Sequence, residues 1–159
     1  MSNKKIILGI DPGIADTGFG VVEFSNNKYK CLDFGSIKTS PKDDLFFRLE
    51  QISLSLEKIL DKYKPNLVSV EKIFFNTNTK TALLVGQARG AILLTIIKKR
   101  ISIVEFTPLQ VKQAVSCYGR ADKNQIKKMV KIFLNLKEEP KSDDAADALA
   151  LAICSTNFL

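Results

Sequence analysis

Residues 4–24 read KKIILGIDPGIADTGFGVVEF, and this stretch predicts how the fold begins. The apolar run over 6–10 is typical of a buried strand, and the apolar pattern resumes at 19–22 after a Pro-Gly turn. Asp11 stands at the end of the first run. A carboxylate in that position either satisfies backbone groups of the turn or carries chemistry, and the rest of the sequence favours chemistry.

Strand patterns dominate the first part of the chain, and helical patterns alternate with them afterwards. Strands are expected at 5–11, 17–25, 29–39, 67–72 and 101–106, and helices at 43–63, 77–99, 109–117, 123–136 and 143–155. Short connections make the first three strands antiparallel neighbours, and the fourth, which follows a helix, is expected parallel to the first. The pattern predicts one α/β domain over residues 1–159, with a mixed five-stranded sheet and helices on both faces.

The residue types present limit the chemistry. The chain has no histidine, and its three cysteines, Cys31, Cys117 and Cys154, are far apart. A zinc site is not expected, and no histidine can serve as general base or activate a nucleophile. The cysteines are expected to be small buried hydrophobes in a reducing compartment. Acid–base or metal chemistry must then rest mainly on Asp and Glu.

Neither a signal peptide nor a membrane span is expected. The apolar run after Lys5 is short and ends at Asp11, and no stretch approaches the ~20 apolar residues of a span. The longest candidate, residues 82–97, contains Gln87 and Arg89. We therefore expect a cytoplasmic protein.

Positive charge is concentrated in one part of the chain. Residues 98–131 carry nine Lys or Arg against two acidic residues, so this window alone equals the net charge of +7 of the whole chain. Such a window is the electrostatic footprint expected for a polyanion, with nucleic acid first. The alternative is a solvated, lysine-rich surface.

Four acids occupy positions that predict a common site. Asp11 and Glu71 end the first and fourth strands, whose carboxyl ends meet at one edge if the strands are parallel neighbours. Asp144 and Asp147 lie three residues apart, on one face of the last helix. Converging carboxylates repel unless a cation lies among them, and their oxygens suit Mg²⁺ or Mn²⁺. Two such ions can drive phosphodiester hydrolysis, which is how a chain without histidine could be a nuclease.

Each acid also has a simpler interpretation. Glu71 could be a surface residue beyond its strand, and Asp143 and Asp144 could be acids favoured by the helix dipole. For Asp143 we retain that interpretation. Asp147, which lies a turn deeper between alanines, fits it less well.

The blocks GIDPGIADTGFGV, VEKIFF, GQARGA and DDAADALALA, in this order and spacing, resemble the RuvC Holliday-junction resolvases of bacteria over about residues 5–155. The resemblance implies a ribonuclease-H-like fold and a homodimer that makes paired symmetric nicks in four-way DNA junctions, in recombination and repair. It implies Mg²⁺-dependent cleavage, and the four carboxylates are expected to hold two such ions per site, with Mn²⁺ as an alternative. It also implies a branch-migration helicase complex, RuvA–RuvB, as partner.

The resemblance also assigns residues. The family's four catalytic acids fall on Asp11, Glu71, Asp144 and Asp147; the third is histidine in some members. Basic residues near the scissile strand fall on Lys112 and Lys123, and both lie in the basic window.

An aromatic that inserts between bases at the junction falls on Phe74. Phe74 and Phe75 follow Glu71 closely, so either is placed to stack on an unpaired base or to lie in the core. Ala82, Gly86 and Gly90 form a small-residue stripe that faces either the sheet or the twin helix of a dimer.

Three other functions are compatible with parts of the sequence. The first motif also resembles a phosphate-binding loop of actin-like and sugar-kinase ATPases, but those proteins need two such domains to close a cleft around ATP. A DNA-binding module without catalysis would place four acids against a phosphate backbone. A related nuclease of the same fold that acts on RNA shares the first motif, whereas GQARGA and ADALA favour the junction resolvases.

Overall fold

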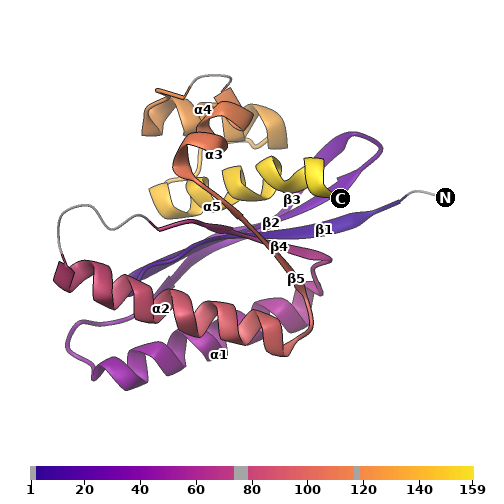
Figure 1. Cartoon of the computed structure of the whole chain (residues 1–159). Coiled ribbons are helices and arrows are strands. Elements are labelled where there is room, and N and C mark those ends of the chain that lie inside the picture. The colour runs from indigo at the N-terminus through magenta and orange to yellow at the C-terminus, as the bar shows by residue number, and fades with distance from the viewer. Residues whose placement is uncertain (1–2, 74–78, 117–118) are drawn as a thin grey trace.

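The structure, a computed structural model, describes residues 3–73, 79–116 and 119–159. One five-stranded sheet lies between two layers of helices, with α1 and α2 on one face and α3, α4 and α5 on the other (Figure 1). The predicted mixed sheet with helices on both faces is therefore confirmed.

The strand order is β3-β2-β1-β4-β5. The strands span Lys5–Asp11 (β1), Asp16–Ser25 (β2), Lys28–Lys38 (β3), Leu67–Glu71 (β4) and Ser102–Phe106 (β5). The first three are antiparallel neighbours, whereas β4 runs parallel to both β1 and β5. β1 is thus the central strand, paired on both sides, which explains its continuous apolar run.

The helices span Leu45–Tyr63 (α1), Thr79–Lys98 (α2), Pro108–Ser116 (α3), Lys123–Leu134 (α4) and Asp143–Cys154 (α5). The main difference from the prediction is the start of α1. Asp44 is its N-cap, and the Asp44 carboxylate accepts a hydrogen bond from the Phe46 amide (2.8 Å). Asp43 and Asp44 therefore precede the helix, because capping favours a non-helical residue at that point.

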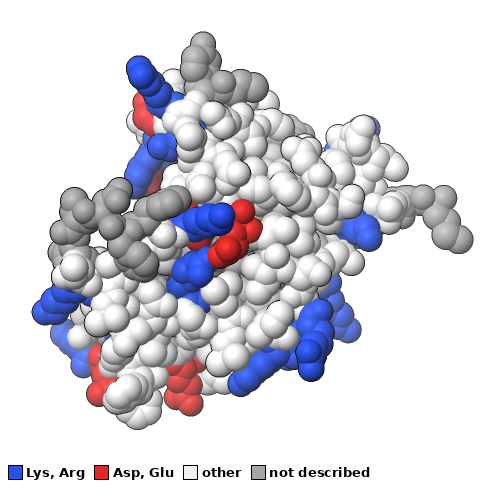
Figure 2. Space-filling view, in the orientation of Figure 1, with Lys and Arg blue, Asp and Glu red and all other residues white. Residues whose placement is uncertain are grey.

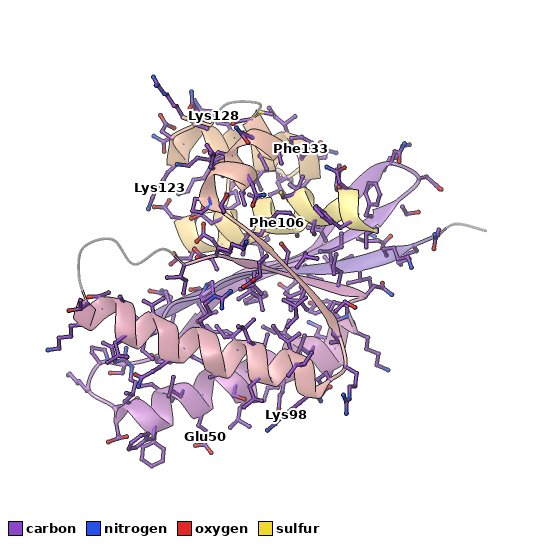
Figure 3. The ribbon with its side chains drawn as sticks, viewed as in Figure 1. Glu50, Lys98, Phe106, Lys123, Lys128 and Phe133 are labelled. Atoms are coloured by element: carbon purple, nitrogen blue, oxygen red, sulfur yellow. The ribbon has the colours of Figure 1, made fainter. Side chains whose placement is uncertain are left out.

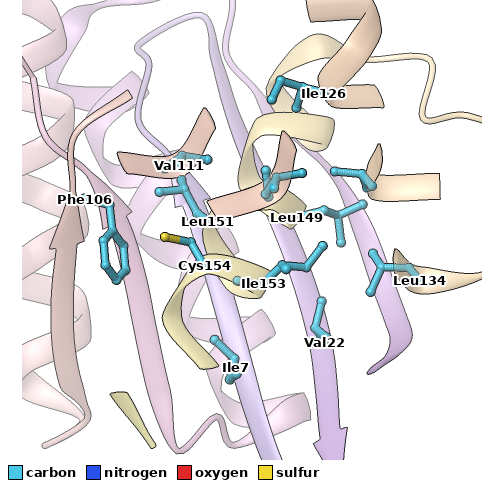
Figure 4. Packing of buried hydrophobic residues seen from close by; sticks show 14 of the residues in the cluster. Ile7, Val22, Phe106, Val111, Ile126, Leu134, Leu149, Leu151, Ile153 and Cys154 are labelled. Atoms are coloured by element: carbon cyan, nitrogen blue, oxygen red, sulfur yellow. The ribbon is translucent and has the colours of Figure 1, made fainter. Parts of the chain in front are cut away.

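Side chains alternate between the two faces of the sheet, so the fold has two apolar clusters. Ile7 and Val22 pack against α3, α4 and α5 (Figure 4), whereas Leu8 and Val21 pack against α1 and α2. Cys154 is buried in the first cluster and Cys31 is half-buried beside it. Cys117 lies outside the described residues.

Helix α5 lies directly on the backbone of the sheet. Gly9 of β1 is level with Gly20 of β2 and with Ser69 of β4, so three small residues form a lane across the sheet. A Cβ on Gly9 would lie 1.8 Å from the Ala148 carbonyl oxygen. The buried Ser69 hydroxyl donates to the Leu151 carbonyl oxygen (3.0 Å). Because no side chain larger than that of serine separates strand from helix along this row, α5 lies very close to the backbone of the sheet.

Helix α2 is half-covered. It packs on the sheet through Ala88, Ile92 and Ile96, and leaves Leu83 and Leu94 more than half exposed. By length and composition α2 is also able to cross a membrane (mean hydropathy 1.3), so the expectation that no segment approaches that size was too strict. Core helices pass the same test, and this helix covers one face of the sheet.

Candidate active site

The carboxyl ends of β1 and β4 bring Asp11 and Glu71 together. The two strands are parallel neighbours in register, with Ile10 level with Val70, so the acid that follows each lies at the same height. Alternation along each strand turns both carboxylates toward the face that α5 covers, because the apolar residue before each acid belongs to the cluster on the opposite face.

Helix α5 brings the other two acids to the same edge. The Ser142 hydroxyl caps the helix by accepting from the Ala145 amide (3.2 Å), so Asp144 lies in the first turn and Asp147 one turn later. Gly18 on β2 lets that first turn approach, since a Cβ there would lie 2.1 Å from the Asp144 carbonyl oxygen. The remainder of α5 is buried.

The four carboxylates interact directly. The Asp11 carboxyl hydrogen-bonds to Glu71 and to Asp144, and Asp147 lies within the electric field of both Glu71 and Asp144. From the sequence, Asp11 and Glu71 form one pair at the ends of two strands, and Asp144 and Asp147 form another on one helix face. The structure brings the two pairs together. Their roles in metal binding and catalysis stay predictions.

Burial and mutual repulsion disturb the ionisation of all four acids. Burial, followed by the charges of Glu71 and Asp147, raises the pKa of Asp11 to about 9. Burial, followed by the charge of Glu71, raises the pKa of Asp147 to about 6. Burial also raises the pKa of Glu71 and of Asp144. Such shifts mark a site whose charges are unbalanced by the protein alone.

The residues present fit a hard divalent cation. The donors are carboxylate oxygens only, the atoms that Mg²⁺ and Mn²⁺ prefer, and the pKa of every acid stays raised even with Lys112 and Lys123 nearby. Within the described ranges, no three His, Cys, Asp or Glu side chains stand as a ready-made cage. Burial and the neighbouring carboxylates raise the pKa of Asp11, so a proton and a cation would compete for the same oxygens.

The raised pKa values predict how stability depends on pH. Between about pH 4 and the raised pKa of Asp11, about 9, the folded protein holds a proton that the unfolded chain releases. The free energy of unfolding in a chelator should therefore fall as pH rises through that window, by at most about 1.4 kcal/mol per pH unit for this group. Thermal melts from pH 5 to 9 in EDTA measure this slope.

Asp11→Asn provides the control for that slope. Asparagine keeps the shape and cannot ionise, so the variant should lose most of the pH dependence. Divalent metal should raise the melting temperature of the parent more at pH 8 than at pH 6, because the metal competes with protons. An identical slope in parent and variant would contradict the ionisation scheme.

A hollow of about 380 Å³ opens beside the four acids. Glu71 and Asp147 line it together with Lys112 from α3 and Lys123 from α4. Lys112 acts electrostatically on Glu71, and Figure 2 shows acidic atoms near the centre of this face with basic atoms beside them. The structure thus places both predicted lysines at the acids, whereas Phe74 and Phe75 lie outside the described residues.

Asp16 is a neighbour that the sequence analysis did not single out. Its carboxylate accepts a hydrogen bond from the Ser36 hydroxyl (2.8 Å), lies 3.8 Å from the Lys38 ammonium, and contributes to the raised pKa of Asp144. The available signal was its place two residues before Gly18, which pairs with Asp11 across β1 and β2. Asp16 thus lies next to the four acids, but its hydrogen bond and its ion pair are both made to residues of β3.

Comparison with known proteins agrees with this geometry. The sequence model of the family described as "Crossover junction endodeoxyribonuclease RuvC" matches residues 7–155. The protein of that name from Alkaliphilus metalliredigens is 53% identical over 149 residues, which cover 94% of this chain and 91% of the relative. The one from Halothermothrix orenii is 53% identical over 152 residues, with 96% and 92% covered.

Solved structures agree with the predicted ribonuclease-H-like fold. The structure described as "T. thermophilus RuvC in complex with Holliday junction substrate" has a TM-score of 0.92 and 35% identity, covering 97% of this chain and 94% of that chain. A yeast mitochondrial Holliday junction resolvase shares the fold at 14% identity, with a TM-score of 0.67 and coverage of 93% and 76%. From its sequence and its structure, the chain belongs to the RuvC family of crossover junction endodeoxyribonucleases.

Proposed function

We propose that this protein is a single-domain nuclease over residues 1–159 that resolves four-way DNA junctions by paired symmetric nicks, in recombination and repair. The observation that carries the proposal is the meeting of Asp11, Glu71, Asp144 and Asp147 at one sheet edge, beside a hollow lined by lysines. Membership of the RuvC family supports the choice of substrate.

The four acids would hold the cofactor, for which we propose two Mg²⁺ ions, with Mn²⁺ as an alternative. When bound, divalent ions supply an activated water and stabilise charge on the phosphate. Asp11 and Glu71 serve as the rigid ligands because each ends a strand of the sheet, and Asp144 and Asp147 complete the set from α5. Rigid mounts suit this role, because a displacement of about 1 Å can cost 10²-fold in rate.

The lysines would hold the DNA. Lys112 and Lys123 both line the hollow, from α3 and α4. Phosphate contacts of this kind set the position of the strand without reading its sequence. We further propose that Phe74, placed three residues after Glu71, stacks on a base at the junction, as the family resemblance implies.

Cleavage of a synthetic four-way junction tests the proposed function. The protein should cut the junction in two opposing strands with Mg²⁺, leave a linear duplex of the same sequence intact, and do neither in EDTA. Equal cutting of both DNA substrates, or cutting of a matched RNA instead, would overturn the assignment. Binding without any cutting in Mg²⁺ or Mn²⁺ would indicate a DNA-binding module.

The outer face of α2 supports a homodimer. Leu83, Gln87, Gly90, Leu94 and Ile97 are all exposed. They recur at alternating steps of four and three, the spacing of a helix–helix seam. Gly90 lies at the middle of this seam, where a Cβ would meet nothing within 4 Å, so another backbone can approach closely. Gly90, the exposed end of the small-residue stripe, thus supports the interpretation that the stripe faces a partner helix and not the sheet.

A charge in this seam should break the dimer. Leu94→Lys places an ammonium group where a second copy would bury it, so we expect a monomer by analytical ultracentrifugation at micromolar concentration. The monomer should nick junctions in one strand at a time, because one active site remains per particle.

Ile132→Lys is the matched control for that substitution. Ile132 is 69% exposed on α4, on the other face of the sheet, and its variant should sediment as the parent does. A parent that sediments as a monomer would contradict the dimer proposal. The RuvA–RuvB helicase complex as partner and a cytoplasmic location remain proposals that rest on the family alone.

A further inference from the structure

Asp143 is the acid of the last helix that the four-carboxylate site does not use. Its two oxygens accept from two lysines of the neighbouring helix α4: Oδ1 lies 2.7 Å from the Lys127 ammonium, and Oδ2 lies 3.4 Å from the Lys123 ammonium. The residue follows the Ser142 cap, directly before Asp144. Asp143 therefore ties the start of α4 to the start of α5 at the edge of the catalytic hollow.

The two lysines differ in their surroundings. The Lys127 side chain is only 17% exposed and also donates to the Lys141 carbonyl oxygen (3.1 Å), so both of its contacts hold the chain together. The Lys123 side chain is 74% exposed and lines the hollow with Glu71 and Asp147. Figure 3 shows Lys123 at the start of α4, at the same end of the molecule as the first turn of α5. Of these two lysines, Lys123 is therefore the one placed to reach a phosphate in the hollow.

We infer that Asp143 is a positioning residue, which acts through Lys123 by holding its ammonium at the rim of the catalytic hollow. This inference rests on the proposed function, because it assumes that Lys123 contacts the DNA. A lysine has four rotatable side-chain bonds, and an unrestrained ammonium would sample many positions. Oδ2 of Asp143 limits the positions that the Lys123 ammonium samples, while Oδ1 is held by its ion pair with the half-buried Lys127.

The same carboxylate opposes DNA binding. Its negative charge lies beside the hollow that the phosphate backbone would enter, and it neutralises part of the attraction of Lys123. Removal of the charge should therefore affect the two functions of the site in opposite directions. Binding should become stronger, whereas cleavage should become slower.

Asp143→Asn tests the inference with two measurements. At saturating enzyme and fixed salt, the single-turnover cleavage rate of a four-way junction should fall about tenfold, while the junction Kd decreases. Asp143→Glu, which keeps the charge, should recover most of the rate. A rate equal to that of the parent, or a fall in rate matched by weaker binding, would overturn the inference.

Lys127→Met separates positioning from support of the fold. The substitution removes the structural half of the pair and should lower the melting temperature. The cleavage rate should stay within about twofold of the parent rate. That change is less than a tenth of the effect that loss of a proton-transfer or positioning group usually has on the rate. If Lys127→Met instead slows cleavage as much as Asp143→Asn, Asp143 supports the fold and the inference fails.

A double substitution distinguishes failure of this inference from failure of the proposed function. In a Lys123→Ala background, Asp143→Asn should cause no further loss of rate, because it acts through the missing ammonium. If Lys123→Ala alone cuts like the parent, the proposed role of Lys123 is wrong. If Lys123→Ala is slow and Asp143→Asn slows it further by the same factor, only the positioning role is wrong.

Discussion

Asp147→Asn is expected to bind a four-way junction and fail to cut it. Asparagine keeps the volume of the side chain and removes the charge that a divalent cation needs. Substitution of a group that only supports a metal ligand costs 10–100-fold, so loss of a ligand should slow single-turnover cleavage by more than about 100-fold. A fluorescence binding assay and a gel-based cleavage assay on the same labelled junction measure the two properties.

The same variant should gain stability in EDTA. Burial and the charge of Glu71 raise the pKa of Asp147 to about 6, so at pH 8 the folded protein carries a charge that its surroundings oppose. Asparagine removes that opposition, and the melting temperature should rise while the increment from added Mg²⁺ becomes smaller. A variant that loses activity and gains stability indicates that the acid serves function, because replacement of a structural acid would lower stability.

Asp61→Asn is the matched control. Asp61 pairs with Lys99 at the surface, on the helix layer that covers the opposite face of the sheet, and its variant should cut as the parent does. An Asp147→Asn protein that cuts at the normal rate would contradict the metal-site assignment.

Gly9→Ala is expected to destabilise the fold severely. The added Cβ would lie 1.8 Å from the Ala148 carbonyl oxygen and 2.9 Å from the Ala152 amide nitrogen, and both are backbone atoms that cannot rotate away. Overpacking of a core costs typically 1–3 kcal/mol, so the free energy of unfolding should fall by about 3 kcal/mol, at the upper end of that range. Urea unfolding followed by circular dichroism gives the value.

Gly35→Ala shows whether any added methyl has that effect. A Cβ on Gly35 of β3 would meet only the Phe19 ring, at 3.1 Å, and a side chain can shift where a helix backbone cannot. We expect a change below about 1 kcal/mol, since mutations without such a clash usually fall near that size. Equal stability of the Gly9→Ala protein and the parent would show that α5 does not rest on the strand as described.

Much of the fold follows from local pattern. The apolar run before Asp11 predicts a central strand, and the helix before β4 predicts that β4 lies parallel to β1. Once those strands are neighbours, strand alternation and register bring Asp11 and Glu71 to one edge. The spacing of Asp144 and Asp147 places them on one helix face, so short-range rules predict the four acids as two pairs, and the tertiary structure brings the pairs together.

The remainder depends on contacts between residues far apart in the chain. A glycine in a strand pattern indicates a bulge or a close approach, and only the tertiary structure shows that Gly9 and Gly18 meet backbone atoms of α5. Asp143 appears in sequence as an ordinary first-turn acid, and its pairing with Lys127 and Lys123 requires α4 to lie beside α5. The outward direction of Gly90 likewise follows from how α2 packs on the sheet.

The lane of small residues under α5 also determines which parts of the protein can vary. Where helix and strand touch through side chains, a substitution can thicken or thin the layer, and the distance between their functional groups changes with it. At Gly9 the contact is between main chains, and at Ser69 a single hydroxyl meets a helix carbonyl oxygen, so there is little compressible layer. Substitutions within the two apolar clusters should therefore leave the separation between Asp11 and Asp147 almost unchanged.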